Sequence, residues 1–294
     1  MKHTTVLLHE AVEALALQPH SVVVDATLGS GGHSALIASQ LSKDGTLIAL
    51  DADQTAIQAV GDIKSAGTVH LVHSNFSHLG EQLKKLGIAQ VDAVLADLGW
   101  RMEQFTDTEK GFSFHDAAGL AMTYGQPDDY PFTAADIVNQ WAAEDIANVL
   151  YGYGEERYSR RIAAAIVAAR KQSPITNAMA LAEIISQAVP AGYRRGRIHP
   201  ATKSFQGLRI AVNDELTVLD AFITESFMAL SAGGRLAIIS FHSVEDRIVK
   251  QRFRSLVAAD KASLVVKRPI TASTEEIKNN PRSRSAKLRI LQKN

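Results

Sequence analysis

Short apolar runs that end in Asp or Gly alternate with helical stretches over roughly the first hundred residues of the chain. The apolar runs are SVVVDATLG, GTLIALDAD, VHLVHSNF and VDAVLADLG. Stretches with helical spacing, SALIASQLS and QTAIQAVGDI, follow the first two of them. Such an alternation is typical of a parallel sheet with helices on both faces, whose ligands bind beyond the carboxyl ends of the strands. The sequence therefore predicts an α/β fold, with Asp25, Asp51 and Asp97 at these strand ends.

The alternation stops near Phe105. Residues 105–132 have little periodicity, and such a long connection favours a functional loop. Helical patterns follow in AADIVNQWAAEDIANVL, ERYSRRIAAAIVAARKQ and AMALAEIISQAV. We expect residues 105–204 to form an inserted helical domain, and residues 1–104 and 205–294 to form the sheet domain. After one long helix, TKSFQGLRIAVNDELTVLDAFITESFMAL, three further strands are predicted in GRLAIISF, SLVVKRPI and SAKLRILQ.

Positive charge gathers in two zones of a chain whose formal net charge is zero. Residues 157–209 contain 10 Lys and Arg against one acid, and residues 247–294 contain 13 against three. The rest of the chain is therefore acidic. A single arginine is more often only a solvated surface residue, but clusters of one sign favour a polyanionic partner such as nucleic acid.

The chain contains no cysteine, so it forms neither disulfides nor thiolate metal sites. Its first residues, MKHTTVLLHEAVEAL, lack the uninterrupted apolar core of a signal peptide, and no segment has the length and composition of a membrane span. We expect a cytoplasmic protein that does not associate with membranes.

Glycines concentrate where the first predicted strand meets a helix, in VVVDATLGSGGHSALI. Glycine permits positive φ and close approach of a ligand, and a helix N-terminus offers unpaired N–H groups. A nucleotide-like ligand fits this loop, although a purely structural turn is an alternative. The loop departs from the G-x-G-x-x-G pattern of dinucleotide sites, because Ser34 stands at the last position. Asp51 ends the second strand, where a carboxylate can accept both ribose hydroxyls of NAD or of S-adenosylmethionine.

Further motifs are spread over nearly the whole length of the chain. They are, in order, VDATLGSGGHSALI, KGFSF, YGEERYSRRIAAAIV, HPATKSFQGLRIAVNDEL and GGRLAIISFHSVEDRIVKQRFR. These motifs and their order resemble a known family, the bacterial small-subunit ribosomal RNA N4-cytosine methyltransferases. This resemblance implies a class I, Rossmann-like methyltransferase with a seven-stranded, mostly parallel sheet and an inserted helical domain for substrate recognition. It also implies S-adenosylmethionine as methyl donor and a cytosine in the decoding centre of 16S ribosomal RNA as target.

The resemblance also assigns the cofactor contacts, while the chemistry of the target amine and the basic zones indicate the other site residues. The cofactor contacts that it implies are Gly31, Gly32, His33, Asp51, Phe76, Asp97 and Gln104. Asp97 is the expected catalytic residue, because its carboxylate and the carbonyl of Leu98 would accept hydrogen bonds from the target amine. The residues expected to contact RNA are Trp100, Arg160, Arg161, Arg194, Arg195, Arg197 and His242. We expect no metal, because His242 and its neighbouring acids lack a second spaced ligand set.

Two segments depart from the family pattern. DLGWRMEQ stands where the family has D-L-G-V-S-S-x-Q, and GLAMTY stands where it has P-L-D-M-R-M. Residues 100–102 therefore differ from the family pattern. In addition, Ala121 replaces an acid and Thr123 replaces an arginine. Either substrate recognition has changed, with Trp100 stacking on the cytosine, or turnover is weakened. In the second case the chain would be a noncatalytic or weakly active RNA-binding assembly factor. The sequence leaves the oligomeric state open, a homodimer included.

Overall fold

The computed structural model describes residues 4–99, 110–115, 117 and 119–294. The chain divides into two compact units. We call Met1–Gly99 with Leu216–Asn294 the sheet unit, and Trp100–Glu215 the insert unit.

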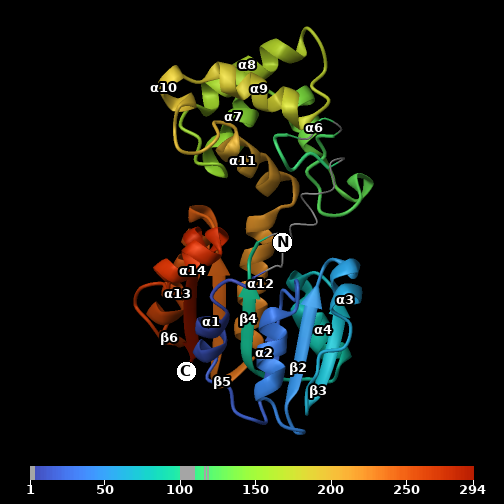
Figure 1. Cartoon of the computed structure of the whole chain (residues 1–294), viewed down its shortest axis with the longest axis vertical. Coiled ribbons are helices and arrows are strands. Elements are labelled where there is room, and N and C mark those ends of the chain that lie inside the picture. The colour runs from blue at the N-terminus through green and yellow to red at the C-terminus, as the bar shows by residue number, and fades with distance from the viewer. Residues whose placement is uncertain (1–3, 100–109, 116, 118) are drawn as a thin grey trace. The chain divides into compact units, whose positions relative to one another are not determined.

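The sheet unit contains a seven-stranded sheet in the order β3-β2-β1-β4-β5-β7-β6 (Figure 1). Its strands are β1 (Val22–Asp25), β2 (Thr46–Asp51), β3 (Thr68–His73), β4 (Val91–Asp97), β5 (Leu230–Ser240), β6 (Ala262–Leu264) and β7 (Lys287–Lys293). Only β7 runs antiparallel to its neighbours β5 and β6. The expected seven-stranded, mostly parallel sheet is confirmed.

Alternate residues of the central strands face two separate apolar cores. In β1, Val23 packs with α1 (Leu8–Ala14) and α2 (Gly32–Gln40), whereas Val24 packs on the opposite face of the sheet. That second core includes α4 (Leu79–Lys85), α12 (Glu215–Ala229) and α13 (Ser243–Ala258). Burial on both faces explains why these strands are continuous apolar runs in the sequence. The remaining short elements are α3 (Gln54–Val60), η1 (Phe76–His78), α14 (Thr274–Asn279) and η3 (Pro281–Ser285).

The insert unit is helical around a core of its own. Its elements are η2 (Pro127–Asp129), α6 (Ala134–Gln140), α7 (Ala143–Gly152), α8 (Ser159–Arg170), α9 (Ala178–Ala188), α10 (Ala191–Arg194) and α11 (Thr202–Val212). Local capping sets some helix starts, because the side chain of Thr133 accepts the N–H of Asp136 while the Asp136 carboxylate accepts the N–H of Thr133. The pattern predicted as one helix over residues 134–150 forms two, since the chain is extended at Trp141 and Ala142.

The prediction of one long helix from Thr202 to Leu230 is wrong. α11 ends at Val212 and α12 begins at Glu215, with Asp214 between them at φ 46°. α11 packs in the core of the insert unit, so that unit extends to residue 215 rather than ending at 204. The boundary expected at residue 104 lies outside the described residues.

The run SLVVKRPI forms only the short strand β6, and beyond it Ile270 makes a single bridge to Leu288 of β7. Among the residues that the structure describes, no helix combines the length and the apolar character needed to cross a membrane.

Candidate functional site

The glycine loop joins β1 to α2 in a conformation that requires glycine. Gly29 has φ 54°, and Gly31, the N-cap of α2, has φ 79°. A Cβ on Gly31 would lie 3.1 Å from Cγ1 of Val60, and a Cβ on Gly32 would overlap Oγ1 of Thr5. The loop backbone is therefore held close to its surroundings with little space for side chains.

Asp51, at the end of β2, fixes this loop. Its Oδ2 accepts the N–H of Gly29 at 2.8 Å, and its Oδ1 accepts the N–H of Asp53 at 2.9 Å. Each carboxylate oxygen can accept a second hydrogen bond, so ribose hydroxyls remain compatible with this arrangement. The sequence predicted the ligand role of Asp51 but missed its role in holding the loop.

Asp25 and Asp97 lie at the ends of neighbouring strands, β1 and β4, and both are carboxyls in buried surroundings. Asp25 is fully buried and accepts hydrogen bonds from Oγ of Ser34 at 2.6 Å and N–H of Thr27 at 3.1 Å. Burial raises the pKa of Asp25 to about 7 in spite of these hydrogen bonds. The backbone N–H of Asp97 donates to Oγ1 of Thr27 at 2.7 Å, which ties the two strand ends together.

The Asp97 carboxyl has the electrostatic surroundings of a cation-binding group. Burial, and then the negative charges of Asp25 and Glu245, raise its pKa well above the usual range. Its Oδ1 is buried and has no hydrogen-bond partner among the described residues, while its Oδ2 lies 3.8 Å from Nδ1 of His33. A positively charged ligand beside Asp97 would relieve the repulsion among these acids and favour the ionised carboxylate.

Phe76 follows β3 and lies in η1. Its ring contacts Phe222 edge to face at a centroid distance of 4.9 Å, and the residue is half-buried. Part of the Phe76 side chain therefore packs against the core formed with α4, α12 and α13. Its exposed part is compatible with the expected contact to an adenine. Gln104, the remaining expected cofactor contact, lies outside the described residues.

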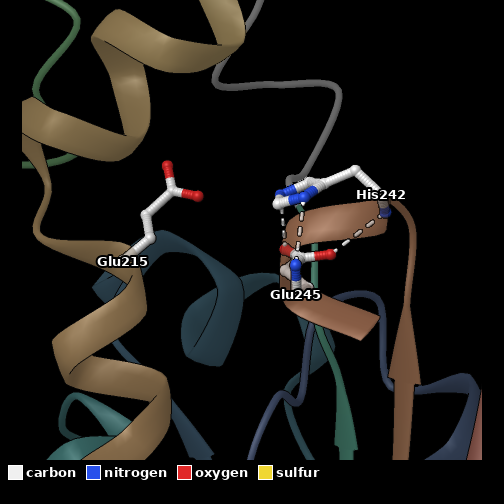
Figure 2. A group of neighbouring side chains, drawn as sticks. All are labelled: Glu215, His242 and Glu245. Atoms are coloured by element: carbon white, nitrogen blue, oxygen red, sulfur yellow. Dashed lines mark hydrogen bonds and ion pairs between the residues drawn. The ribbon is translucent and has the colours of Figure 1, made fainter. Parts of the chain in front are cut away.

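His242 caps α13 (Figure 2). Its Nδ1 accepts the N–H of Glu245 at 3.3 Å, and Oε2 of Glu245 accepts the N–H of Phe241 at 2.9 Å. Nε2 of His242 and Oε1 of Glu245 are 3.1 Å apart, which assigns the proton to Nε2. The H-S-V-E spacing of a capping box was the signal for this role, and the sequence analysis missed it.

Glu215, also drawn in Figure 2, stands at the start of α12 and is assigned to the insert unit. There it accepts hydrogen bonds from Nε of Arg209 at 2.6 Å and from Oη of Tyr124 at 2.8 Å. These contacts join the end of α11 to the segment that precedes η2. We attribute to Glu215 a role in the structure of the insert unit.

The model of the MraW methylase family matches residues 1–294, the whole chain. The chain belongs to the MraW methylase family. It is 45% identical to "Ribosomal RNA small subunit methyltransferase H" of Symbiobacterium thermophilum, over 99% of this chain and 96% of that protein. Proteins of the same name from Limosilactobacillus fermentum and Brevibacillus brevis are each 42% identical, over 99% of this chain and 98% of theirs. A solved rRNA methylase from Streptococcus thermophilus aligns over 99% of each chain at 13% identity and a TM-score of 0.45.

In this MraW-family chain, the arginines expected to contact RNA lie on the surface of the insert unit. Arg160 and Arg161 are exposed in the first turn of α8. Arg194, Arg195 and Arg197 are exposed at and just after the end of α10. No carboxylate among the described residues forms an ion pair with any of the five, so their charges are available to an anionic partner.

The sequence analysis missed a buried acid, Glu156, that organises this basic region. Oε2 of Glu156 accepts the hydroxyl of Tyr193 at 2.7 Å, and Oε1 accepts the N–H of Tyr158 at 2.8 Å. The guanidinium of Arg157 lies over the rings of Tyr158 and Tyr193, at 4.8 Å and 5.0 Å. Glu156 thus connects the start of α8 to α10, the two elements that present the arginines.

The segments that depart from the MraW-family pattern are described only in part. Trp100, Arg101 and Met102 lie outside the described residues. Thr123 is fully buried, and its Oγ1 donates to the carbonyl of Gly125 at 3.1 Å. At the position where the family has an arginine, this chain therefore has a small side chain whose hydroxyl forms a local hydrogen bond inside the insert unit.

Proposed function

We propose that this chain transfers a methyl group from S-adenosylmethionine to the exocyclic N4 amine of a cytosine in the decoding centre of 16S ribosomal RNA. The observation that carries the proposal is the convergence of the glycine loop, Asp51 and Asp97 at the carboxyl ends of adjacent strands. Full-length relatives named as ribosomal RNA small subunit methyltransferases support it. The enzyme would act in the cytoplasm, on the small ribosomal subunit.

The residues present fit S-adenosylmethionine. This cofactor supplies a methyl group on a positively charged sulfur. Gly31, Gly32 and His33 would line it with the loop and the start of α2, and Asp51 would accept hydrogen bonds from its ribose. The buried Oδ1 of Asp97, which has no hydrogen-bond partner within the described part of the chain, and the acids around it provide the negative surroundings that a sulfonium requires. We propose that Phe76 and Gln104 contact the adenine.

Asp97 would act on the target amine by accepting hydrogen bonds from its N–H groups. The lone pair of a cytosine amine is delocalised into the ring, so hydrogen-bond acceptors around its N–H groups increase its nucleophilicity and stabilise the charge that develops on it. The Asp97 carboxylate and the Leu98 carbonyl are suitably located at the end of β4. Because the donor methyl is already activated, the main task of the protein is to orient the amine.

The exposed arginines of the insert unit, at 160, 161, 194, 195 and 197, would bind phosphates of the RNA. Phosphate contacts fix the position of a nucleic acid, while the target base must leave its stack to reach a buried site. The roles expected for Trp100 and His242 remain predictions. Because His242 is engaged in the α13 cap, any RNA contact would use the exposed remainder of its ring.

Methyl transfer to isolated small subunits from a strain that lacks this gene tests the proposal. We expect the purified protein to form N4-methylcytosine, detected by mass spectrometry of digested ribosomal RNA. Asp97→Asn should lower the rate by about 100- to 1,000-fold, the usual effect of losing one stabilising polar group in an active site. Asp44→Asn, an exposed acid at the opposite edge of the sheet, is the matched control and should leave the rate unchanged.

The departures at residues 100–102, Ala121 and Thr123 favour a second candidate function. In it the chain binds RNA and S-adenosylmethionine but turns over slowly or not at all, as an assembly factor. Binding of both ligands by the wild-type protein without formation of N4-methylcytosine would support this candidate and exclude the first.

A further inference from the structure

A basic pocket of about 260 Å³ lies in the sheet unit, outside the site described above. Five of its lining residues are cationic, two in α13, two in the connection after β6 and one in β7. These cationic residues are Lys250, Arg254, Lys267, Arg268 and Arg289. Phe253 and Ile290, both buried, contribute apolar lining.

Four of these five cations are uncompensated. Arg289 is paired, because its Nε lies 2.6 Å from Oδ1 of Asp246. In the described part of the chain, no carboxylate forms an ion pair with Lys250, Arg254, Lys267 or Arg268. Several like charges around one hollow raise the local positive potential and attract anions.

Strand register places one end of this pocket, next to Ile270, at the same edge of the sheet as Asp97. Asp97 of β4 is opposite Ile239 of β5, Ile239 is opposite Leu288 of β7, and Leu288 bridges to Ile270. Neighbouring strands are about 4.8 Å apart, so three spacings put Ile270 about 15 Å from Asp97. Arg268 precedes Ile270 by only two residues.

The pocket lies on the side of β5 away from the cofactor residues. Gly31 and Asp51 belong to β1 and β2, on one side of β4, whereas β7 and β6 lie on the other. An RNA strand that presents a base to Asp97 can continue in that direction. With a rise of about 3.4 Å per nucleotide in a stacked strand, a few nucleotides cover about 15 Å.

We propose that Lys250, Arg254, Lys267 and Arg268 bind backbone phosphates of the substrate RNA a few nucleotides from the target cytosine. The inference rests on the proposed function and extends the RNA-binding surface from the insert unit to the sheet unit. These cations lie on α13 and on the connection after β6; Arg254, Lys267 and Arg268 are exposed and Lys250 is half-buried. They suit phosphates of a continuous strand, which are recognised by charge without sequence readout.

The test measures the affinity of the full-length protein for a single-stranded RNA oligonucleotide of mixed sequence as salt concentration is varied. Each lost phosphate contact lowers the slope of log K against log salt by about 0.7 for single strands. We expect the double variant K267Q/R268Q to lower that slope by about 1.4 and to bind S-adenosylmethionine with unchanged affinity. The charge-conserving variant K267R/R268K should retain the wild-type slope.

The matched control is K43Q/K64Q, because both lysines are exposed and lie in connections that precede the strands β2 and β3, at the opposite edge of the sheet. It removes the same charge and should leave the slope unchanged. An equal slope in K267Q/R268Q and wild type, or an equal decrease in K43Q/K64Q, would overturn the inference. RNA binding is measured without methyl transfer, so failure of the proposed function would appear separately, as wild-type protein that forms no N4-methylcytosine.

Discussion

Replacing Gly31 with alanine tests whether the loop backbone sets the affinity for S-adenosylmethionine. Gly31 has φ 79°, and a Cβ at this position would lie 3.1 Å from Cγ1 and 3.2 Å from Cγ2 of Val60. An L-residue in the left-handed region costs about 1–2 kcal/mol relative to glycine. Alanine therefore raises the free energy of the native loop conformation, relative to other conformations, by at least this amount. The close contact with Val60 adds to the backbone strain.

The expected change in Kd follows if the cofactor binds only the native conformation of the loop. Binding must then restore the strained conformation, and about 1.4 kcal/mol corresponds to tenfold in an equilibrium constant. We expect the Kd for S-adenosylmethionine to rise about 5- to 30-fold in Gly31→Ala. Isothermal titration calorimetry measures this change, and urea unfolding measures the accompanying loss of stability.

Gly61→Ala is the control for backbone strain alone. Gly61 has φ 59° after α3, and no atom lies within 4 Å of the Cβ position. It should lose about 1–2 kcal/mol of unfolding free energy with an unchanged Kd. If Gly31→Ala lost the same stability but bound S-adenosylmethionine as tightly as wild type, the loop backbone would not determine cofactor affinity.

Three further predictions concern buried or capping groups. Because folding raises the pKa of Asp25 from 3.8 to about 7, the folded state binds more protons than the unfolded state over this interval. Stability without cofactor should therefore fall as pH rises from about 4 to 7, and Asp25→Asn should flatten the decrease in urea unfolding curves. Thr123→Arg restores the family residue but puts a charge at a fully buried position, so thermal unfolding should show destabilisation by more than about 2 kcal/mol. A stable variant would show that the charge finds a partner. His242→Ala should cost about 0.5–2 kcal/mol by removing the α13 cap, whereas His242→Asn should retain most stability, since its amide oxygen can accept the N–H of Glu245. Equal losses in both variants would contradict a capping role.

The parts of the fold that were predictable depend on residues close together in the sequence. The strand β1 and the glycines after it were recognisable because a strand buried on both faces is a continuous apolar run and a positive φ favours glycine. Asp51 and Asp97 were predictable as residues at strand ends because each ends such a run, and their site roles stay predictions.

The break between α11 and α12 was not predictable in this way. Both helices have helical spacing up to the junction, so local pattern favoured one helix. Tertiary contacts stabilise the break, because the Asn213 amide donates to the carbonyl of Met122 at 2.7 Å and accepts the N–H of Tyr124 at 2.9 Å. These partners are about 90 residues away in the chain, beyond the reach of a local pattern.

The sequence by itself determined the strands, the glycine loop and the family, because these depend on the order of residue types along the chain. Only the tertiary structure decided which charges act together. Asp25 contributes to the raised pKa of Asp97 because β1 and β4 are adjacent in the sheet although separated in the sequence. The cations of the basic pocket likewise meet because α13 and β7 pack together. Electrostatic interaction depends on distance in space and on burial, and the sequence specifies these only through the folded chain.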